Sequence, residues 1–194
     1  MAKIVVAQEQ KDSFESSLFA DVFQLRYEAF VNRLNWEVVA DNGRERDCFD
    51  DLQPYHIAIK DDEGRVQGCW RALPTLGSYM LKDVFPVMLQ GESVPRHRQV
   101  WEISRLVVRK GAAKPTHGCI GDISVDLVLS FRDFALKHGI RSYVTVTTLA
   151  GERLLKMLGV RLRRLGAGKV IQVGIEKTVA LWIDVNDIPE IKKN

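Results

Sequence analysis

Two charged residues lie in the middle of the most apolar predicted strand of this sequence. Glu102 and Arg105 belong to VWEISRLVV, residues 100–108, whose other positions are mostly β-branched, aromatic or aliphatic. A charge in a central strand costs free energy unless a partner neutralises it, so each side chain must meet one. Two interpretations fit: a structural ion pair, or a buried carboxylate whose pKa rises until it serves as a general base.

Carboxylates also gather in a polar segment, residues 34–54. Asp47 and Asp50 belong to its run DCFDD, and the segment also contains Asn-Gly and Pro. We expect a long irregular loop here, and loops of that length in compact domains are usually functional or disordered. Taken alone, carboxylates on such a loop are most often simply solvated.

An arginine and two aromatic residues surround the end of the first predicted helix. Arg26 precedes Phe30 by one helical turn, and Trp36 follows just beyond the helix. Aromatic faces attract cations, and an arginine fork binds carboxylates. The simpler interpretation is an arginine at the edge of the core, with a buried stem and a solvated head.

The elements that must position these residues follow from the periodicity of apolar side chains. Helical spacing predicts helices over residues 14–33, 119–137 and 151–158. Strand patterns occupy residues 4–7, 55–60, 65–73, 100–108, 142–148, 160–165, 169–175 and 178–185. DDEG, ending in Gly64, predicts a hairpin turn. This order indicates a single α+β domain over residues 1–194, a sandwich around one mostly antiparallel sheet.

A basic, glycine-bearing loop, RKGAAKPTHG, follows the strand at 100–108. Backbone N–H groups at a helix N-terminus attract phosphate, and Arg109, Lys110 and Lys114 add positive charge. Residues 109–169 as a whole hold 12 Lys and Arg against 4 Asp and Glu, although the net charge of the chain is only +3. A solvated basic face explains this asymmetry, and so does a phosphate-bearing or acidic partner.

Composition excludes several classes of protein. The chain has 194 residues, of which 46% are hydrophobic and 27% charged, so a disordered chain is excluded. We expect no membrane span, because no stretch approaches the roughly 18 apolar residues that a span needs. The N-terminus turns polar too early for a secretory signal. Cys48, Cys69 and Cys119 form no CxxC pair, which favours reduced thiols in the cytoplasm over disulfides or a structural zinc site.

Taken together, the candidate residues resemble a known pattern. Arg26, Phe30, Trp36, Asp47, Asp50, Arg71, Phe85, Glu102 and Arg105 match, in order and spacing, the pattern of the acyl-homoserine-lactone synthases, the autoinducer synthases of bacterial quorum sensing. LRYEAFVNRLNW, RDCFDD, GCWRALPT, LKDVFP, WEISRLVV and VTVTTLAGERLLKMLG are similar to segments of that family and cover nearly the whole chain. The resemblance implies a fold related to the GNAT N-acetyltransferases, an α/β/α sandwich around one mostly antiparallel, partly splayed sheet. RKGAAKPTHG departs from the tight GNAT pyrophosphate loop.

The resemblance implies two substrates, S-adenosyl-L-methionine and a fatty acyl thioester of acyl carrier protein or coenzyme A. The amine of S-adenosyl-methionine attacks the thioester carbonyl to form an amide. Its carboxylate then attacks its own γ-carbon, which closes the lactone and expels methylthioadenosine. Since both molecules are substrates, no cofactor and no metal are expected.

Roles for individual residues follow from the same resemblance. The expected catalytic residues are Glu102, as the base that receives the amine proton, and Arg105. The site for S-adenosyl-methionine is expected to comprise Arg26, Phe30, Trp36, Asp47, Asp50 and Arg71. Its carboxylates suit the cation, its aromatic rings suit the sulfonium and the adenine, and its arginines hold the substrate carboxylate or tie the acidic loop to the sheet.

Two further surfaces are expected for the acyl donor. The acyl pocket is expected to comprise Phe85, Thr145 and Thr147, although the threonines are equally good strand formers. The docking face for an acidic carrier protein is expected to comprise Arg153, Lys156, Arg161, Arg163 and Arg164. Coenzyme A would also suit basic groups, and the sequence does not distinguish the two donors. We expect a cytoplasmic monomer that binds no nucleic acid.

Two alternative functions are compatible with parts of the sequence. A generic GNAT acetyltransferase would use acetyl-CoA, but the acidic segment and the loose phosphate loop argue against it. A non-catalytic module would use the basic segment to bind nucleic acid, but that segment lacks interleaved aromatic residues.

Strand geometry adds one prediction. On an ideal strand, Glu102 and Arg105 point to opposite faces, yet the resemblance places both in one site. A β-bulge between them shifts the parity of every residue after it. We therefore predict a bulge or splay within residues 102–105, facing the cleft. The alternative is that Arg105 lies behind the sheet and only pairs with Asp47 or Asp50.

Overall fold

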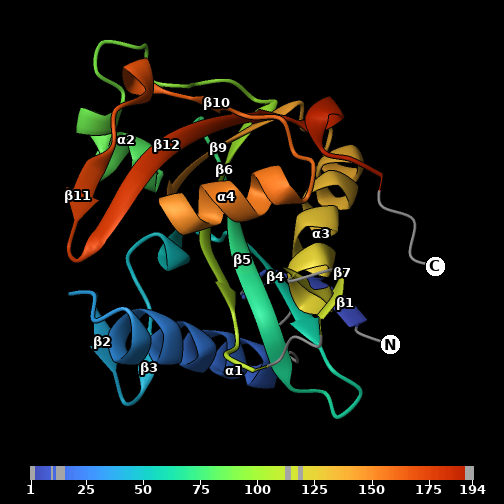
Figure 1. Ribbon diagram of the computed structural model, residues 1–194. Coiled ribbons are helices and arrows are strands. Elements are labelled where there is room, and N and C mark those ends of the chain that lie inside the picture. Colours follow the sequence, from blue (N-terminus) through green and yellow to red (C-terminus); the bar gives the residue numbers. More distant parts are fainter. Residues whose placement is uncertain (1–2, 10, 12–15, 112–114, 118–119, 191–194) are drawn as a thin grey trace. The chain divides into compact units, whose positions relative to one another are not determined.

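The computed structural model describes residues 3–9, 11, 16–111, 115–117 and 120–190 (Figure 1). The chain forms two compact units. The first unit comprises Met1–Ala72 and Arg105–Leu127, and the second unit comprises Leu73–Ser104 and Val128–Asn194. That residues 1–194 act as one domain stays a prediction.

The first unit contains strands in the hydrogen-bonded order β1-β4-β5-β6, and β5 and β6 continue into the second unit. The strands span Lys3–Ala7 (β1), Tyr55–Lys60 (β4), Val66–Pro74 (β5) and Val100–Val108 (β6). β4 pairs antiparallel with both β1 and β5. The predicted turn after β4 is confirmed, because Gly64 has a φ of +80° and its N–H donates to the carbonyl of Asp61 at 3.0 Å.

The first helix differs from its prediction over residues 14–33. α1 (Ser16–Tyr27) continues directly into a π-helix, η2 (Glu28–Arg33), where the N–H of Leu34 donates to the carbonyl of Ala29 at 3.0 Å. An apolar period of 3.6 residues does not reveal the wider turn of a π-helix. One face of α1 packs into the core of the unit, which includes Leu18, Val22, Leu25, Ala58, Cys69 and Val107.

The polar segment 34–54 is more regular than we expected. β2 (Ala40–Asp41) and β3 (Arg44–Glu45) form a short hairpin beside α1, and η3 (Asp50–Leu52) is a 3₁₀ turn (Figure 1). Asn42 and Gly43 close the hairpin with φ values of +48° and +74°. Asn-Gly favours this two-residue turn, because both residues tolerate left-handed backbone.

The segment after β6 contains β7 (Pro115–His117) and β8 (Ile120–Gly121), which pair antiparallel. α3 (Asp122–His138) therefore begins three residues later than predicted, at an acidic residue that suits a helix N-terminus. It ends at His138, one residue beyond the prediction and directly before Gly139, whose φ is +65°. Lys114 and Cys119 lie outside the described residues.

The strands of the second unit follow the order β6-β9-β12-β10. β6 and β9 pair in parallel, whereas β12 pairs antiparallel with β9, β10 and β11. The strands span Ser142–Thr148 (β9), Arg163–Arg164 (β10), Ile171–Val173 (β11) and Glu176–Asp184 (β12). The helices span Met80–Asp83 (α2), Pro86–Met88 (η4), Leu149–Met157 (α4), Gly166–Gly168 (η5) and Val185–Asp187 (η6). The prediction of an α+β fold with a mostly antiparallel sheet is confirmed.

The strands predicted over 160–165 and 169–175 are much shorter in the structure. Gly166, Ala167 and Gly168 all have positive φ, so the chain turns between β10 and β11. Gly166 also approaches the backbone closely, since a Cβ added there would lie 1.8 Å from the Met88 carbonyl oxygen. This position therefore requires glycine for two reasons.

We expect Gly166→Ala to lower the free energy of unfolding by about 3 kcal/mol, because it combines left-handed strain with a backbone clash. Gly64→Ala is the matched control, since Gly64 is also left-handed but a Cβ there meets nothing within 4 Å. It should cost only about 1 kcal/mol. Urea unfolding measures both values, and equal losses would contradict the role of the clash.

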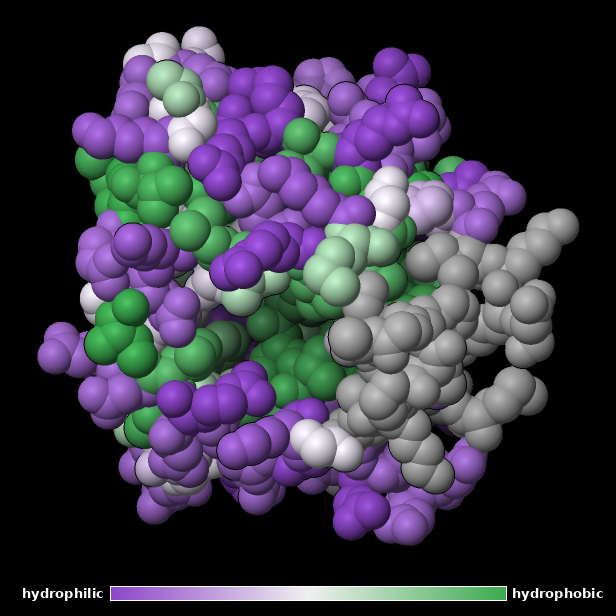
Figure 2. All heavy atoms as spheres, viewed as in Figure 1, coloured by the Kyte–Doolittle hydropathy of each residue, from purple (hydrophilic) through white to green (hydrophobic). Residues whose placement is uncertain are grey.

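Hydrophilic residues cover much of the face shown in Figure 2, while apolar ones gather over α2 and β11 of the second unit. Val84, Val87 and Ile175 are among the exposed apolar side chains of these segments and their turns. None of the helices in the described part of the chain is both long and apolar enough to cross a membrane.

Candidate active site

Six charged side chains form a buried group in the first unit, which we call the charge cluster. Its members are Arg26, Arg71, Arg105, Glu45, Asp47 and Asp50. Their exposed fractions range from 0% for Asp50 to 11% for Asp47. Three arginines balance three carboxylates, so each buried charge has a partner of the opposite sign.

Arg26 connects the end of α1 to the acidic segment. Its Nη1 and Nη2 donate to the two oxygens of Asp50, both at 2.9 Å, and its Nε donates to Glu45 Oε2 at 2.5 Å. With 1% exposure, Arg26 is no core-edge residue with a solvated head, so that simpler interpretation is wrong. Burial opposes the charge of Arg26, but Asp50 and Glu45 raise its pKa further above its usual value.

Arg71, on β5, ties the same segment to the sheet. Its Nη1 and Nη2 donate to Asp47 Oδ1 and Oδ2 at 2.5 and 3.1 Å, and Nη1 also donates to Asp50 Oδ1 at 2.8 Å. Burial would raise the pKa of Asp50, but Arg26 and Arg71 hold it far below its usual value. The interpretation of Asp47 and Asp50 as solvated loop carboxylates is therefore wrong.

Arg105, on β6, completes the charge cluster. Its Nη2 lies 2.9 Å from Glu45 Oε1 and 2.6 Å from Asp47 Oδ2. Its φ is +54°, a conformation that is rare for a long side chain and interrupts the regular alternation of β6. The hydrogen-bonded register of β6 with β9 extends only to Ile103, opposite Thr145. The predicted irregularity within residues 102–105 is confirmed.

Two members of this site were missed by sequence reasoning. Glu45 links Arg26 and Arg105, but it lies in the charged run RERD, where nothing local indicates burial. His56 lies on β4 directly opposite Arg71, with Nε2 3.7 Å from Asp50 Oδ1. Within the described residues, that Nε2 is buried and has no hydrogen-bond partner.

We expect His56 to make the fold sensitive to acid. Burial lowers the pKa of His56 to about 3, and Asp50 only partly opposes this. An unfolded histidine has a pKa of about 6.5, so between about pH 6.5 and 3 the unfolded chain binds a proton that the folded chain excludes. Stability should therefore fall as the pH falls through this window.

Urea unfolding at pH 7 and pH 5 tests this expectation. Between these values His56→Leu should lose about 2 kcal/mol less stability than the wild type. His97→Leu, which changes an exposed histidine, should keep the wild-type dependence. If His56→Leu loses as much stability between pH 7 and pH 5 as the wild type, His56 takes up a proton as readily in the folded chain as in the unfolded chain.

The two predicted aromatic residues lie beside the charge cluster. Phe30 stacks on Trp36 with ring centroids 5.1 Å apart and planes 9° from parallel. The Arg105 guanidinium lies 5.4 Å from the Phe30 ring centroid. Trp36 Nε1 is buried and has no hydrogen-bond partner among the described residues. A buried donor without an acceptor is costly, so this N–H is suited to a ligand atom.

Glu102, the predicted base, lies in the second unit and is 1% exposed. Its Oε2 accepts from the N–H of Met80 at 2.9 Å, and its Oε1 accepts from the N–H of Leu81 at 2.7 Å. The carboxylate therefore holds the first turn of α2. Burial and the charge of Glu102 raise the pKa of Tyr79, the residue before that turn.

The residues predicted for the acyl pocket lie in the second unit. Phe85 is half-buried directly before η4, and Thr145 is 6% exposed. Thr147 is half-buried, and its Oγ1 lies 2.2 Å from the place that a Cβ on Gly151 would occupy. The hydroxyl of Thr147 therefore faces α4 at a position that only glycine leaves open.

The predicted docking face carries less free charge than its sequence indicates. Arg164 donates to both oxygens of Glu152 at 2.9 and 2.6 Å, and Lys156 adds a contact at 2.7 Å. These hydrogen bonds lower the pKa of Glu152 to about 2. Arg163 pairs with Glu92 at 2.9 Å. Arg153 donates to a carbonyl of its own helix, and Arg161 is exposed.

In the part of the chain that the structure describes, no group of three or more His, Cys, Asp or Glu residues is arranged to hold a metal ion. The carboxylates of the charge cluster are occupied by arginines instead.

Comparison with known proteins identifies the family. The family model described as autoinducer synthase matches residues 9–191. An acyl-homoserine-lactone synthase from Aliivibrio fischeri is 35% identical over 184 residues, which cover 95% of this chain and 95% of that protein. The chain therefore belongs to the acyl-homoserine-lactone synthases, a family of enzymes, as the resemblance implied.

Solved structures agree with this assignment. The crystal structure of the AHL synthase LasI is 29% identical, with a TM-score of 0.84, covering 100% of this chain and 99% of LasI. A ternary complex of TofI with an inhibitor and MTA is 27% identical, with a TM-score of 0.77, covering 95% and 91% of the two chains. A putative N-acetyltransferase from Lactobacillus plantarum, 16% identical with a TM-score of 0.61 and covering 95% and 98%, shares the fold alone.

Proposed function

We propose that this chain joins an acyl group from a thioester to the amine of S-adenosyl-L-methionine and closes the product to an N-acyl-L-homoserine lactone. The observation that carries the proposal is the charge cluster, which brings together residues of the family pattern beside Phe30, whose ring stacks on Trp36. MTA, present in the TofI complex, is the by-product that this reaction releases.

The first step is acyl transfer. The amine nitrogen forms a bond to the thioester carbonyl carbon, the C–S bond breaks, and the thiol leaves. An α-amino group has a pKa of roughly 7.7–8.0, so little free energy is needed to remove its proton. We assign this proton to Glu102, directly or through one water. The backbone N–H groups of Met80 and Leu81 donate to its two oxygens, which fixes the orientation of the carboxylate.

The second step is lactone formation. The substrate carboxylate oxygen bonds to the γ-carbon, the bond from that carbon to sulfur breaks, and methylthioadenosine leaves. The sulfonium is already a good leaving group, so this step needs positioning more than acid or base. We assign the positioning to Phe30, Trp36 and the charge cluster, in which Asp47 is the most exposed carboxylate.

The donor is an acyl thioester of carrier protein or coenzyme A. Arg153 and Arg161 are the residues of the proposed docking face that no carboxylate holds in the described structure, so they are the ones we assign to an acidic carrier. We propose that the chain is cytoplasmic, which the free thiols of Cys48 and Cys69 support, and that it is a monomer. No resident cofactor is proposed.

Incubation of the purified chain with S-adenosyl-methionine and a series of acyl thioesters tests the function. Mass spectrometry should detect an acyl-homoserine lactone and methylthioadenosine in equal amounts. Transfer from acetyl-CoA to an amine without methylthioadenosine release would instead support a generic acetyltransferase.

A further inference from the structure

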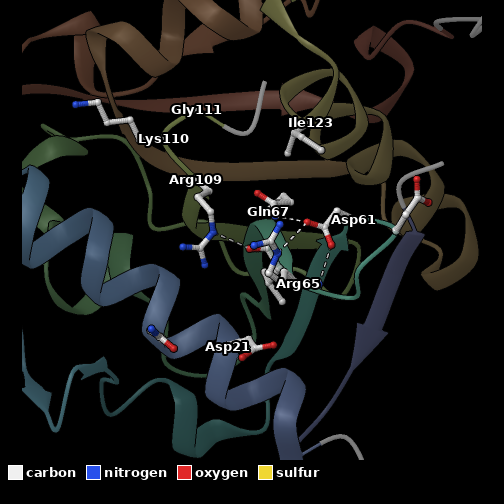
Figure 3. Close-up of a pocket in the computed structure, with 11 residues that line it drawn as sticks. Asp21, Asp61, Arg65, Gln67, Arg109, Lys110, Gly111 and Ile123 are labelled. Carbon is white, nitrogen blue, oxygen red and sulfur yellow. Dashed lines mark hydrogen bonds and ion pairs between the residues drawn. The ribbon is translucent and has the colours of Figure 1, made fainter. Parts of the chain in front are cut away.

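A surface groove of about 620 Å³ lies in the first unit beside the start of the basic loop (Figure 3). Arg65, Arg109 and Lys110 line it together with Asp21 and Asp61. The sequence suggested that Arg109 and Lys110 attract a phosphate. In the structure, Lys110 points away from Arg109, and the guanidinium of Arg109 points toward α1 (Figure 3).

Arg109 already has protein partners in this groove. Its Nη1 donates to Glu28 Oε2 at 2.5 Å, and its Nε donates to the carbonyl of Val66 at 3.1 Å. Its backbone N–H donates to the carbonyl of Gln67 at 2.8 Å. Because a carboxylate occupies this guanidinium, a phosphate there would have to displace Glu28 or lie beside a like charge.

Glu28 is the first residue of the π-helix η2, and Arg33 is its last. Arg33 Nη1 donates to the carbonyl of Val108 at 3.2 Å. Both ends of η2 are therefore attached to two consecutive residues, Val108 and Arg109, at the end of β6. A π-helix is rare and occurs mostly as a single turn near functional sites, so external anchors at both ends are significant.

We propose that the Arg109–Glu28 ion pair is a positioning clamp, which fixes η2 and, through it, the aromatic pair that faces S-adenosyl-methionine. This inference rests on the proposed function. η2 carries Phe30, whose carbonyl accepts from the N–H of Trp36 at 2.8 Å. A change in η2 therefore moves both rings, and with them the surface that Arg105 contacts.

Arg109 and Glu28 are positioning residues, since neither is proposed to touch the reacting atoms. Their side chains are 32% and 36% exposed, so water screens the pair in part. We therefore expect a graded effect, on the binding of S-adenosyl-methionine rather than on the chemical step.

The test compares Arg109→Met, Glu28→Gln and the double variant in the full chain. Each single variant should raise KM for S-adenosyl-methionine about three- to tenfold, with kcat and the donor KM nearly unchanged. The double variant should raise this KM no further than the more strongly affected single variant does, because both substitutions remove the same ion pair. Arg65→Met and Glu63→Gln break an exposed pair near the same groove and are the matched controls.

Amide hydrogen exchange over residues 28–36 supplies a readout that does not depend on activity. Exchange there should accelerate in Arg109→Met and Glu28→Gln but not in the controls. If the wild-type chain makes no lactone, the proposed function fails while exchange still tests the clamp. If Arg109→Met raises the KM for the acyl donor while Glu28→Gln leaves every kinetic constant unchanged, Arg109 contacts a phosphate of the donor instead. That result, or unchanged exchange in both variants, would overturn the clamp.

Discussion

Glu102→Gln is expected to lower kcat by about 10²–10⁴-fold, the usual contribution of a general base. The amide keeps the shape of the side chain but cannot take the amine proton. Affinity for S-adenosyl-methionine should change little, because its proposed contacts lie in the charge cluster and the aromatic pair. Single-turnover measurement of amide formation separates this chemical step from binding.

The substitution also weakens a structural contact, and a control must account for it. Glu102 holds the backbone N–H groups of Met80 and Leu81, and a glutamine cannot accept from both in the same way. Asp83→Asn is the matched control, since Asp83 accepts from the N–H of Tyr79 at 3.2 Å at the same short helix. It should leave kcat within about threefold. Equal losses in both variants, or full activity in Glu102→Gln, would remove Glu102 as the base.

Arg26→Met is expected to destabilise the fold by about 3–5 kcal/mol, the cost of breaking a buried ion pair from one side. Glu45 and Asp50 would then be left with fewer partners in a site from which water is excluded. Arg65→Met makes the same substitution in an exposed pair and should cost less than about 1 kcal/mol. Urea unfolding at neutral pH provides the comparison, and similar losses in the two variants would contradict the buried role of Arg26.

The stability that Asp50 contributes should also depend on pH. Its pKa is lowered in the folded chain, so the unfolded chain binds more protons when the pH falls below the usual range of aspartate. The contribution is therefore complete above that range and disappears in acid. Arg26→Met should weaken this acid dependence, because Arg26 is a principal cause of the lowered pKa.

Local sequence pattern was sufficient for the elements whose signal lies within a few residues. β6 has the predicted bounds, and the β4–β5 turn lies at DDEG, because β-branched runs and turn residues act locally. The irregular backbone at Arg105 could also be predicted from the sequence, because Glu102 and Arg105 point to opposite faces of an ideal strand. By contrast, the π-helix depends on one extra residue in a turn, which a 3.6-residue period does not record.

The partners of the charged residues were harder to predict. Nothing in RERD distinguishes Glu45, which is fully buried, from its exposed neighbour Arg44, because burial here depends on where α1 and β6 bring Arg26 and Arg105. His56 was hidden for the same reason, since its neighbour Asp50 comes from another element. The free charge of the predicted docking face was overestimated for the same reason. Few acidic residues lie near it in the sequence, but the fold places Glu92 beside Arg163 and Glu152 beside Arg164.

The balance of the charge cluster has a consequence for how S-adenosyl-methionine would reach the site that we propose for it. Three positive and three negative groups leave no net monopole, so the cluster generates little long-range attraction for the sulfonium. Capture must then depend on the local dipoles between neighbouring charges, which act only within a few ångströms and are fixed by the fold. Since these charges are also shielded from solvent, added salt has little to screen. S-adenosyl-methionine should therefore enter by unassisted diffusion, at a rate that changes little with ionic strength, whereas an acidic carrier protein should dock more slowly as salt is added.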